Sequence, residues 1–448
     1  MHQVEIDYTT PNSIFYNVFS ISSLRKIEID KNNGDKMIYI VKSVRRETTM
    51  QPIEIRPSIY WIGLNDRHTE FFEGLWSIRE DGISYNSYLI DDKKKVIIDL
   101  CNEMSIDELF EQIQHFTNPA ELDYLVINHM EPDHSGGLKA LVNLAPNIKL
   151  ICTAKAKEML QSFYEITENI QVVSDGEELD LGSHKLKFFS TPFVHWPETM
   201  MTYETTEKIV FSCDGFGGYG TLNGTIFDDR ALDLAHYEKQ ALRYYVNIVS
   251  SYSKPVKNAI AKLDTVPIEV VAPSHGLVWR KSPHRIIDLY RKWADYASTS
   301  GDPAVTLLYC SMYGSTEKLM EVVAQGIADE EVPVTIFNVS HAEMGDMLPS
   351  LWTKKGVMIG APTYEGGLFP HMSFVLDVAQ RKHIFNKISA TFGSYGWGGG
   401  SEREYNERIK GLRWQSFGIF TDKGMPNTAD MNAGRKFGAE FARKILEE

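Results

Sequence analysis

The pattern of hydrophobic and polar positions is most regular in the last third of the chain. Apolar runs there alternate with amphipathic stretches that have helical spacing, such as 317–330, 371–382 and 429–448. Such alternation is typical of buried parallel strands joined by helices. After a Ser/Gly/Asp-rich break at 297–303, the pattern therefore predicts a doubly wound parallel sheet over 303–448. Its five strands are expected at 304–310, 332–339, 356–362, 388–394 and 414–420.

Short strands dominate the pattern from residue 50 to 298, which we interpret as a separate domain. A helix is expected at 105–116, capped by Ser105 with Asp107 and Glu108 in its first turn, and another at 156–166. Several of the strands end in a polar residue. The remaining segment, 1–49, is predicted to be a short β-rich extension of unknown role. The strands of the domain are expected at 58–64, 84–90, 94–100, 122–129, 148–154, 184–191, 208–214 and 268–275.

Length, charge and cysteine usage narrow the class of protein. A chain of 448 residues is too long for one ordinary core, so two domains are expected, with a third allowed. A net charge of −14 argues against nucleic acid or an anionic membrane as the main partner. The chain has neither an apolar run of membrane-spanning length nor a signal-peptide pattern at its start. Its four cysteines are scattered without a CxxC pair, which predicts buried thiols, a reducing cytoplasm and no cysteine-held zinc or iron–sulfur site.

The stretch INHMEPDHSGG at 127–137 carries the densest group of candidate metal ligands. Two imidazoles and two carboxylates fall within six positions after a predicted strand. Three more candidates each follow an apolar run and precede a turn. A shared central Asp214 would let each of two metals take two imidazoles, one terminal carboxylate and one oxygen of that aspartate. The seven candidates are His129, Glu131, Asp133, His134, His195, Asp214 and His275.

Three loops at predicted strand ends of the last domain form a second group of candidates. The first, SMYGST, offers hydroxyls and backbone N–H groups at a helix N-terminus, where a phosphate can bind. It matches neither a Walker loop nor the G-x-G-x-x-G fingerprint, and alone it could be an ordinary helix cap. The other two loops carry aromatic side chains that could flank a flavin ring. The candidates are Ser311, Met312, Tyr313, Gly314, Ser315, Thr316, Pro362, Thr363, Tyr364, Ser394, Tyr395, Gly396, Trp397, Gly399 and Gly400.

The combination resembles a known family. H-x-E-x-D-H followed by His, Asp and His is similar to the metallo-β-lactamase pattern, with Glu131 where the hydrolases have His. Carboxylate together with imidazole suits non-haem iron. The glutamate, with steps of 61, 19 and 61 positions from His134 through His195 and Asp214 to His275, resembles the flavodiiron proteins. The three loops of the last domain resemble a flavodoxin.

This resemblance implies an αββα sandwich over 50–298 and a flavodoxin-like domain over 303–448. By resemblance, His129, Glu131 and His195 hold one iron, Asp133, His134 and His275 hold a second, and Asp214 bridges them. FMN would pass electrons to this site, which would reduce O2 to water, NO to N2O, or both. An external donor such as rubredoxin or a reduced cofactor is implied, as is a head-to-tail homodimer or a dimer of dimers.

Two alternatives remain at this point. One is a zinc hydrolase of the metallo-β-lactamase type fused to a flavodoxin domain, which Glu131 opposes. The other is an electron carrier in which only the flavodoxin half works, which the complete ligand set opposes. One departure from the family also matters: in EFFEGLW, Glu73 stands where many members have a histidine, which leaves the preference for O2 or NO open.

Overall fold

The computed structural model describes residues 27–30, 38–41 and 51–447, in two compact units, Met1–Gln51 and Pro52–Glu448. In the first unit, strand β1 (Ile27–Asp30) pairs antiparallel with β2 (Ile38–Val41). The rest of the predicted β-rich extension lies outside the described residues. All that follows concerns the second unit.

The first part of this unit contains two main β-sheets. The larger has the order β13-β12-β11-β10-β9-β4-β3 and the smaller has the order β14-β15-β16-β17-β18. Strands β10 to β13 are parallel neighbours, and β17 is parallel to β18. The larger sheet comprises β3 (Ile53–Arg56), β4 (Ile59–Trp61), β9 (Tyr88–Ile90), β10 (Val96–Ile98), β11 (Tyr124–Val126), β12 (Lys149–Cys152) and β13 (Ile170–Val172). The smaller comprises β14 (Glu178–Asp180), β15 (Lys185–Ser190), β16 (Met200–Glu204), β17 (Ile209–Cys213) and β18 (Val270–Pro273).

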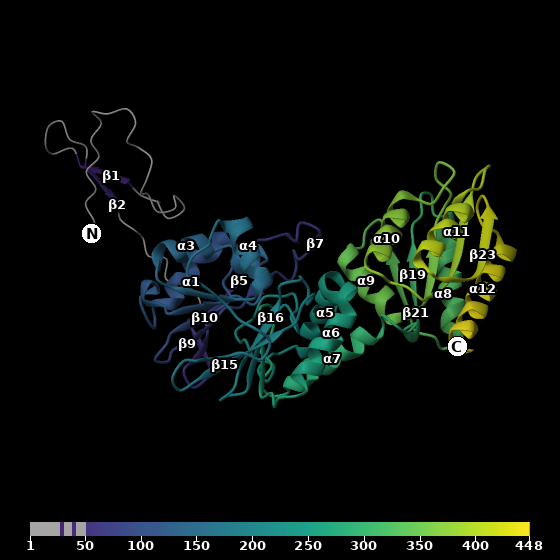
Figure 1. The fold of residues 1–448 in the computed structure, drawn as a ribbon. Helices are drawn as coiled ribbons and strands as arrows, with labels where there is room; N and C mark the ends of the chain where they lie inside the picture. Colours follow the sequence, from purple (N-terminus) through teal and green to yellow (C-terminus); the bar gives the residue numbers. More distant parts are fainter. Residues whose placement is uncertain (1–26, 31–37, 42–50, 448) are drawn as a thin grey trace. The chain divides into compact units, whose positions relative to one another are not determined.

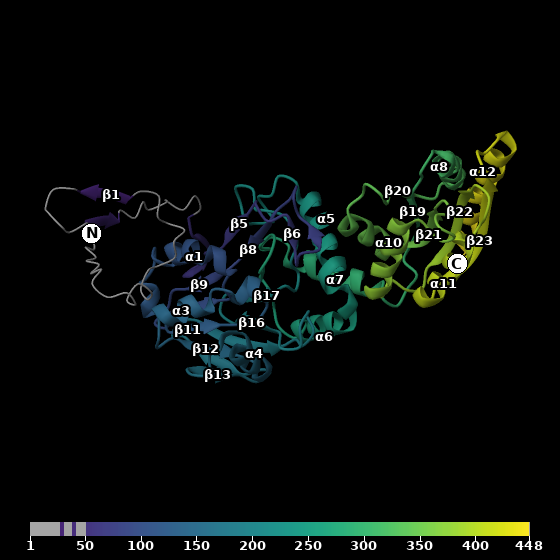
Figure 2. The same ribbon diagram turned by 90° about the horizontal axis from the view of Figure 1, so that it is seen from above.

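Helices lie outside both sheets, as the predicted αββα sandwich requires (Figures 1 and 2). Two short ribbons, β5 (Leu64–Asp66) with β8 (Ile83–Tyr85) and β6 (Phe71–Phe72) with β7 (Trp76–Ser77), complete this part. The helices are α1 (Ile106–Ile113), α2 (Pro132–Ser135), α3 (Leu138–Leu144), α4 (Ala154–Tyr164), α5 (Leu234–Tyr244), α6 (Ser253–Leu263) and α7 (Pro283–Asp295). A π-helix, η4 (Tyr245–Val249), continues α5 directly.

The predicted cap of the first helix is correct in position but wrong in mechanism. Ser105 is the N-cap residue of α1, yet its side chain makes no capping hydrogen bond. Instead the Asn102 side chain accepts a hydrogen bond of 3.0 Å from Ser105 N and caps a short 3-10 turn, Glu103–Ser105, ahead of the helix. Because this turn precedes the helix, α1 begins without a capping hydrogen bond from the Ser105 hydroxyl.

The second part is the predicted doubly wound sheet, with the strand order β20-β19-β21-β22-β23 and parallel pairing throughout. Helices α8 and α12 pack together, and α10 contacts both α9 and α11 (Figure 2). The α/β prediction is therefore confirmed. The strands are β19 (Asp302–Tyr309), β20 (Val334–Asn338), β21 (Lys354–Gly360), β22 (Ile388–Tyr395) and β23 (Gln415–Lys423). The helices are α8 (Ser315–Asp329), α9 (Met344–Thr353), α10 (Pro370–Arg381), α11 (Ser401–Leu412) and α12 (Thr428–Glu447).

The two parts contact each other through α9, which packs against α5 and the π-helix. Buried Arg243 lies 2.8 Å from Asp346 on α9, measured from Nε to Oδ1. The indole N–H of Trp352 donates to the backbone carbonyl of Trp293 at 2.9 Å. Lys382, just after α10, donates to the carbonyl of Asn247. The contact is thus both charged and aromatic.

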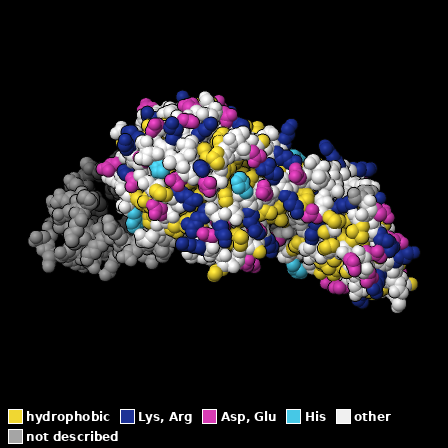
Figure 3. Space-filling view, turned by 90° about the horizontal axis from the view of Figure 1, so that it is seen from below, with side chains coloured by type: hydrophobic (Ala, Val, Ile, Leu, Met, Phe, Trp, Pro, Cys, Tyr) yellow, Lys and Arg dark blue, Asp and Glu magenta, His cyan; other side chains and the backbone are white. Residues whose placement is uncertain are grey.

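The exposed surface carries both signs of charge. On the face shown in Figure 3, Lys and Arg side chains lie among Asp and Glu rather than in a field of one sign.

No helix in the described part of the chain has the length and apolar character needed to cross a membrane.

Candidate metal centre and cofactor loops

The seven predicted metal ligands lie close together because each belongs to a turn or short helix that follows a strand of the sandwich. His129 lies three residues after β11, and Asp214 directly follows β17. Because β17 and β18 are parallel, the ends of these two strands lie side by side, which brings His275 close to Asp214. His195 comes from the loop between β15 and β16. The architecture therefore gathers at one place residues that are far apart in sequence.

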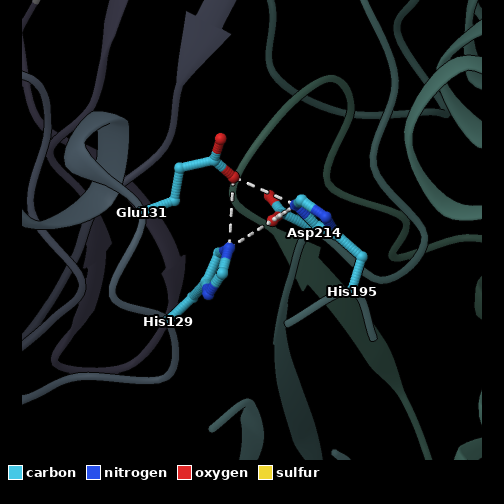
Figure 4. A group of neighbouring side chains, drawn as sticks. All are labelled: His129, Glu131, His195 and Asp214. Carbon is cyan, nitrogen blue, oxygen red and sulfur yellow. Dashed lines mark hydrogen bonds and ion pairs between the residues drawn. The ribbon is translucent and has the colours of Figure 1, made fainter. Parts of the chain in front are cut away.

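One group consists of His129, Glu131, His195 and Asp214, shown in Figure 4. The Nε2 atoms of His129 and His195 lie 3.2 and 3.0 Å from Glu131 Oε2. The same two nitrogens lie 3.3 and 3.2 Å from Asp214 Oδ2. Two imidazole nitrogens and two carboxylate oxygens thus face a common point.

The second group consists of Asp133, His134 and His275, and it uses the other oxygen of Asp214. The Nε2 atoms of His134 and His275 lie 3.5 and 3.3 Å from Asp133 Oδ2. They lie 2.9 and 3.4 Å from Asp214 Oδ1. Asp214 therefore presents one oxygen to each group, as a bridging carboxylate would.

The burial of these groups fits a pair of cations. His129, His134, Asp214 and His275 are at most 2% exposed. Both Asp133 carboxylate oxygens, Asp214 Oδ2 and His275 Nε2 are buried without a hydrogen-bond partner among the described residues. Buried polar atoms are seldom left unpaired, so these four atoms point to a bound group. Imidazole and carboxylate donors in equal sets suit two transition-metal ions.

The ionisable groups of the site shift one another's pKa values. Burial alone would lower the pKa of His195, but the neighbouring carboxylates of Asp214 and Glu131 outweigh it and raise the pKa to about 9. For His275, burial is likewise outweighed by Asp133 and Asp214, which raise the pKa to about 10. Burial acts to raise the pKa of Glu131, yet His129 and His195 lower it to about 2. The carboxylates thus favour the positively charged form of the imidazoles at this site.

Sequence reasoning did not single out Glu198, which lies behind the first group. Its Oε1 atom is 2.6 Å from His129 Nδ1 and accepts a hydrogen bond of 2.9 Å from Met130 N. The only sequence signal is its place in HWPE, three residues after His195. On the other group, His275 Nδ1 lies 2.7 Å from the backbone carbonyl oxygen of Ser84.

Glu73, the departure from the family pattern, lies close to the first group. Its backbone has a positive φ of 49°, and its carboxylate accepts a hydrogen bond of 3.0 Å from Trp76 Nε1. Desolvation raises the pKa of Glu73, and the negative charge of Glu131 raises it further. Lys382 from the flavodoxin-like part lies over the Trp76 ring, 5.0 Å from its centroid.

The three loops proposed for a cofactor meet at the C-terminal edge of the parallel sheet. Thr316 Oγ1 lies 3.0 Å from Ser394 Oγ, which joins the first loop to the third. Thr363 N donates to Ser394 O at 2.9 Å, and its hydroxyl donates to Ser401 at 3.1 Å. The third loop ends at Gly400, because Ser401 already belongs to α11. Open α/β sheets bind ligands at this edge.

These loops have the features of a flavin site. Gly314, with a φ of +89°, forms the N-cap of α8 and donates to the Ser311 hydroxyl at 3.0 Å. Side chains at the rim stand in solvent: Tyr313 is 88% and Trp397 is 95% exposed. A Cβ added at Gly396 or Gly399 would meet nothing within 4 Å, which leaves open space beside the rim. Met312 and Tyr364 are also exposed, whereas Pro362 is buried and Ser315 and Tyr395 are partly buried.

Comparison with known proteins supports both parts. Residues 83–276 match the ODP family beta lactamase model, and residues 307–437 match the flavodoxin model. A nitric oxide reductase from Moorella thermoacetica is 31% identical, over 89% of this chain and its own full length. Rubredoxin oxygen:oxidoreductase from Desulfovibrio gigas is 28% identical with a TM-score of 0.83, over 89% of this chain and 99% of that one. The flavodiiron protein from Giardia intestinalis is 25% identical with a TM-score of 0.84, over 89% and 97%.

The matched ranges lie within the two domains expected at 50–298 and 303–448, although the boundaries themselves stay a prediction. The relative from Moorella thermoacetica matches along its entire length, so the order of the two parts is shared as well as each part alone. The two domain matches and the similarity over the full length of the relative agree with the two candidate metal groups that share Asp214. The chain therefore belongs to the flavodiiron protein family.

Proposed function

We propose that this chain is an oxidoreductase that reduces O2 to water, NO to N2O, or both, with electrons that pass from an external donor through FMN to two iron ions. The relatives whose names state these activities support the proposal. The observation that carries it is the division of Asp214, which offers Oδ2 to one ligand group and Oδ1 to the other.

The chain's own residues set up the reaction. We assign His129, Glu131 and His195 to one iron, Asp133, His134 and His275 to the other, and Asp214 to both. When bound, FMN would relay electrons from the external donor, and the two irons would supply the redox chemistry and a template for the diatomic substrate. Glu131 and Asp133 have side chains 13% and 14% exposed and are the ligands nearest to solvent, so they mark the side from which substrate enters.

For FMN we propose the three loops named above. The backbone of 311–316 at the start of α8 would hold the phosphate, since a helix N-terminus favours an anion. Tyr364, Tyr395 and Trp397 would flank the flavin ring, with Pro362, Thr363, Ser394, Gly396, Gly399 and Gly400 as backbone or polar contacts.

We further propose a head-to-tail homodimer, alone or as a dimer of dimers. Two separate sets of exposed apolar side chains support it. Phe71 and Leu75 flank Glu73, and Phe193 lies two residues before His195, with exposures of 38%, 47% and 45%. Tyr313 and Trp397 stand out from the flavin loops. Burial of such side chains against a second copy would stabilise the pair. A strictly monomeric active enzyme, measured by light scattering during turnover, would contradict this arrangement.

The donor and the compartment are also proposals. A small redox protein such as rubredoxin, or a reduced cofactor, would reduce the FMN. All four cysteines are free and buried, which supports a reducing cytoplasm.

The first experiment combines metal analysis with amperometry. Purified protein is assayed for iron, zinc and flavin, reduced anaerobically, and given O2 or NO in separate runs. We expect two irons per chain, bound FMN, and consumption of at least one gas. Zinc with hydrolytic activity would support the hydrolase alternative, and flavin without metal would support the carrier. In the Asp214→Ala variant, retained gas turnover would refute the site assignment.

A further inference from the structure

Glu198 distinguishes one half of the metal site from the other. It is 1% exposed, and its Oε1 atom receives both His129 Nδ1 at 2.6 Å and Met130 N at 2.9 Å. Because a backbone N–H already donates to this oxygen, the carboxylate is fixed in place before any metal binds. His129 is then held with Nδ1–H toward Glu198 and Nε2 toward the metal.

The second half of the site is built differently. His275 directs Nδ1 to the Ser84 backbone carbonyl oxygen at 2.7 Å, and so has a neutral partner where His129 has a carboxylate. The surroundings of the first pair strengthen the difference. Trp196 packs edge-on against His129 with ring centroids 5.1 Å apart, and His129 is 0% exposed, so the charge of Glu198 acts through a medium of low polarity.

Glu198 also keeps a feature that serves no purpose in packing alone. Its second oxygen, Oε2, is buried without a hydrogen-bond partner among the residues that the structure describes. An unpaired carboxylate oxygen in the interior is costly. Retention of the charge at this place is accounted for if it acts on the metal through His129.

We propose that Glu198 is the positioning residue of His129 and that its charge makes the two metal positions unequal. The position formed by His129, Glu131 and His195 binds a divalent cation more tightly, and stabilises a higher metal charge, than the position formed by Asp133, His134 and His275. The inference rests on the ligand assignment of the proposed function, but it concerns metal binding and not turnover.

The test is a stepwise titration of the metal-free full-length protein with Co(II), followed by calorimetry and by visible absorption. Wild type is expected to bind two ions in two resolved steps. Glu198→Gln keeps an oxygen for both donors but removes the charge, and we expect it to weaken one step by about 10- to 100-fold, leaving the other unchanged. In the iron-loaded protein, the same variant should bring the two midpoint potentials of the iron pair closer together.

A matched control is available on the second sheet. Glu204 and His184 form another buried pair, with Oε1 and Nδ1 3.1 Å apart, and neither belongs to the metal groups. Glu204→Gln should leave both binding steps and both potentials as in wild type. The proposal is overturned if Glu198→Gln binds both ions as wild type does, even if Glu198→Ala loses metal. Should either variant fail to fold, a single unresolved binding step in wild type would overturn it. If no metal bound even in wild type, the proposed function would fail with it.

Discussion

Replacement of Arg243 by glutamine should destabilise the first part of the chain where it meets α9. Arg243 is 5% exposed and its guanidinium has several partners on both sides of the contact. Nε lies 2.8 Å from Asp346 of α9, and NH2 donates to the Ser77 backbone carbonyl. Nη1 lies 3.4 Å from Asp81, and the group sits over the Tyr219 ring, 5.3 Å from its centroid.

These contacts do not weigh equally. The Asp346 side chain is 47% exposed, so water can replace the arginine there and little free energy is lost. Asp81 keeps Gln240 as a hydrogen-bond donor at 2.9 Å. The main losses are the charged donor to the buried Ser77 carbonyl and the cation–π contact, each worth about 1.5–2 kcal/mol. We therefore expect the variant to lose about 3 kcal/mol of stability, near the lower end of the range for breaking a buried ion pair.

The assay is urea unfolding followed by tryptophan fluorescence, with iron and flavin content measured in the same samples. Because a protein of two domains need not unfold in one step, the first transition is the one to compare. Limited proteolysis at 297–303 should also become faster. Arg285→Gln is the matched control, since Arg285 pairs with Glu238 on the surface and should contribute at most about 1 kcal/mol. If the two variants lose the same stability, the buried contacts of Arg243 with Ser77 and Tyr219 contribute no more than a surface ion pair, and the reasoning is wrong.

Three further predictions follow from the sites. Asp214→Ala should lose most of the bound iron while the FMN absorbance stays at one flavin per chain; equal loss of flavin would show that the variant is misfolded. Trp397→Ala should weaken FMN binding about fivefold in a fluorescence titration, since aromatic stacking is worth roughly 1 kcal/mol. Because the Trp397 side chain is exposed, the melting temperature of the flavin-free protein should stay unchanged. Addition of Fe(II) to metal-free protein at pH 7 should release at least two protons, because His195 and His275, with pKa values of about 9 and 10, are charged before binding, and the pKa of His129 is also raised well above its ordinary value. The release should fall as the pH rises through 9 to 10, and constant release across that range, measured with an indicator dye, would contradict the assignment. Those raised pKa values also stabilise the metal-free fold below the ordinary histidine pKa near 6.5, an effect that is lost as the pH rises through 9 to 10.

The sequence indicates the candidate ligands, which the structure brings together, more clearly than the surroundings of the site. Each candidate ligand is a polar residue close to the end of an apolar run, a pattern that can be recognised from the sequence alone. The helix α9 was not predicted, because its segment contains Gly345 and Pro349, which are poor helix formers inside a helix. Its formation depends on packing against the π-helix, and sequence separation hides that contact. Glu198 was overlooked for a similar reason, since nothing local marks it as the partner of His129, 69 positions away.

The two sheets of the sandwich account for the way in which candidate ligands far apart in sequence come together. Ligands that lie 146 positions apart come from different sheets, since His129 follows β11 of the larger sheet and His275 follows β18 of the smaller one. Parallel pairing of β17 with β18 brings Asp214 and His275 together, and the sandwich places His129 beside them. One difference between the two candidate positions lies behind the ligands, where His129 meets a carboxylate and His275 meets a backbone carbonyl. The sheets therefore bring the two groups of candidate ligands together, and the proposed inequality of the two positions rests on the residues behind them.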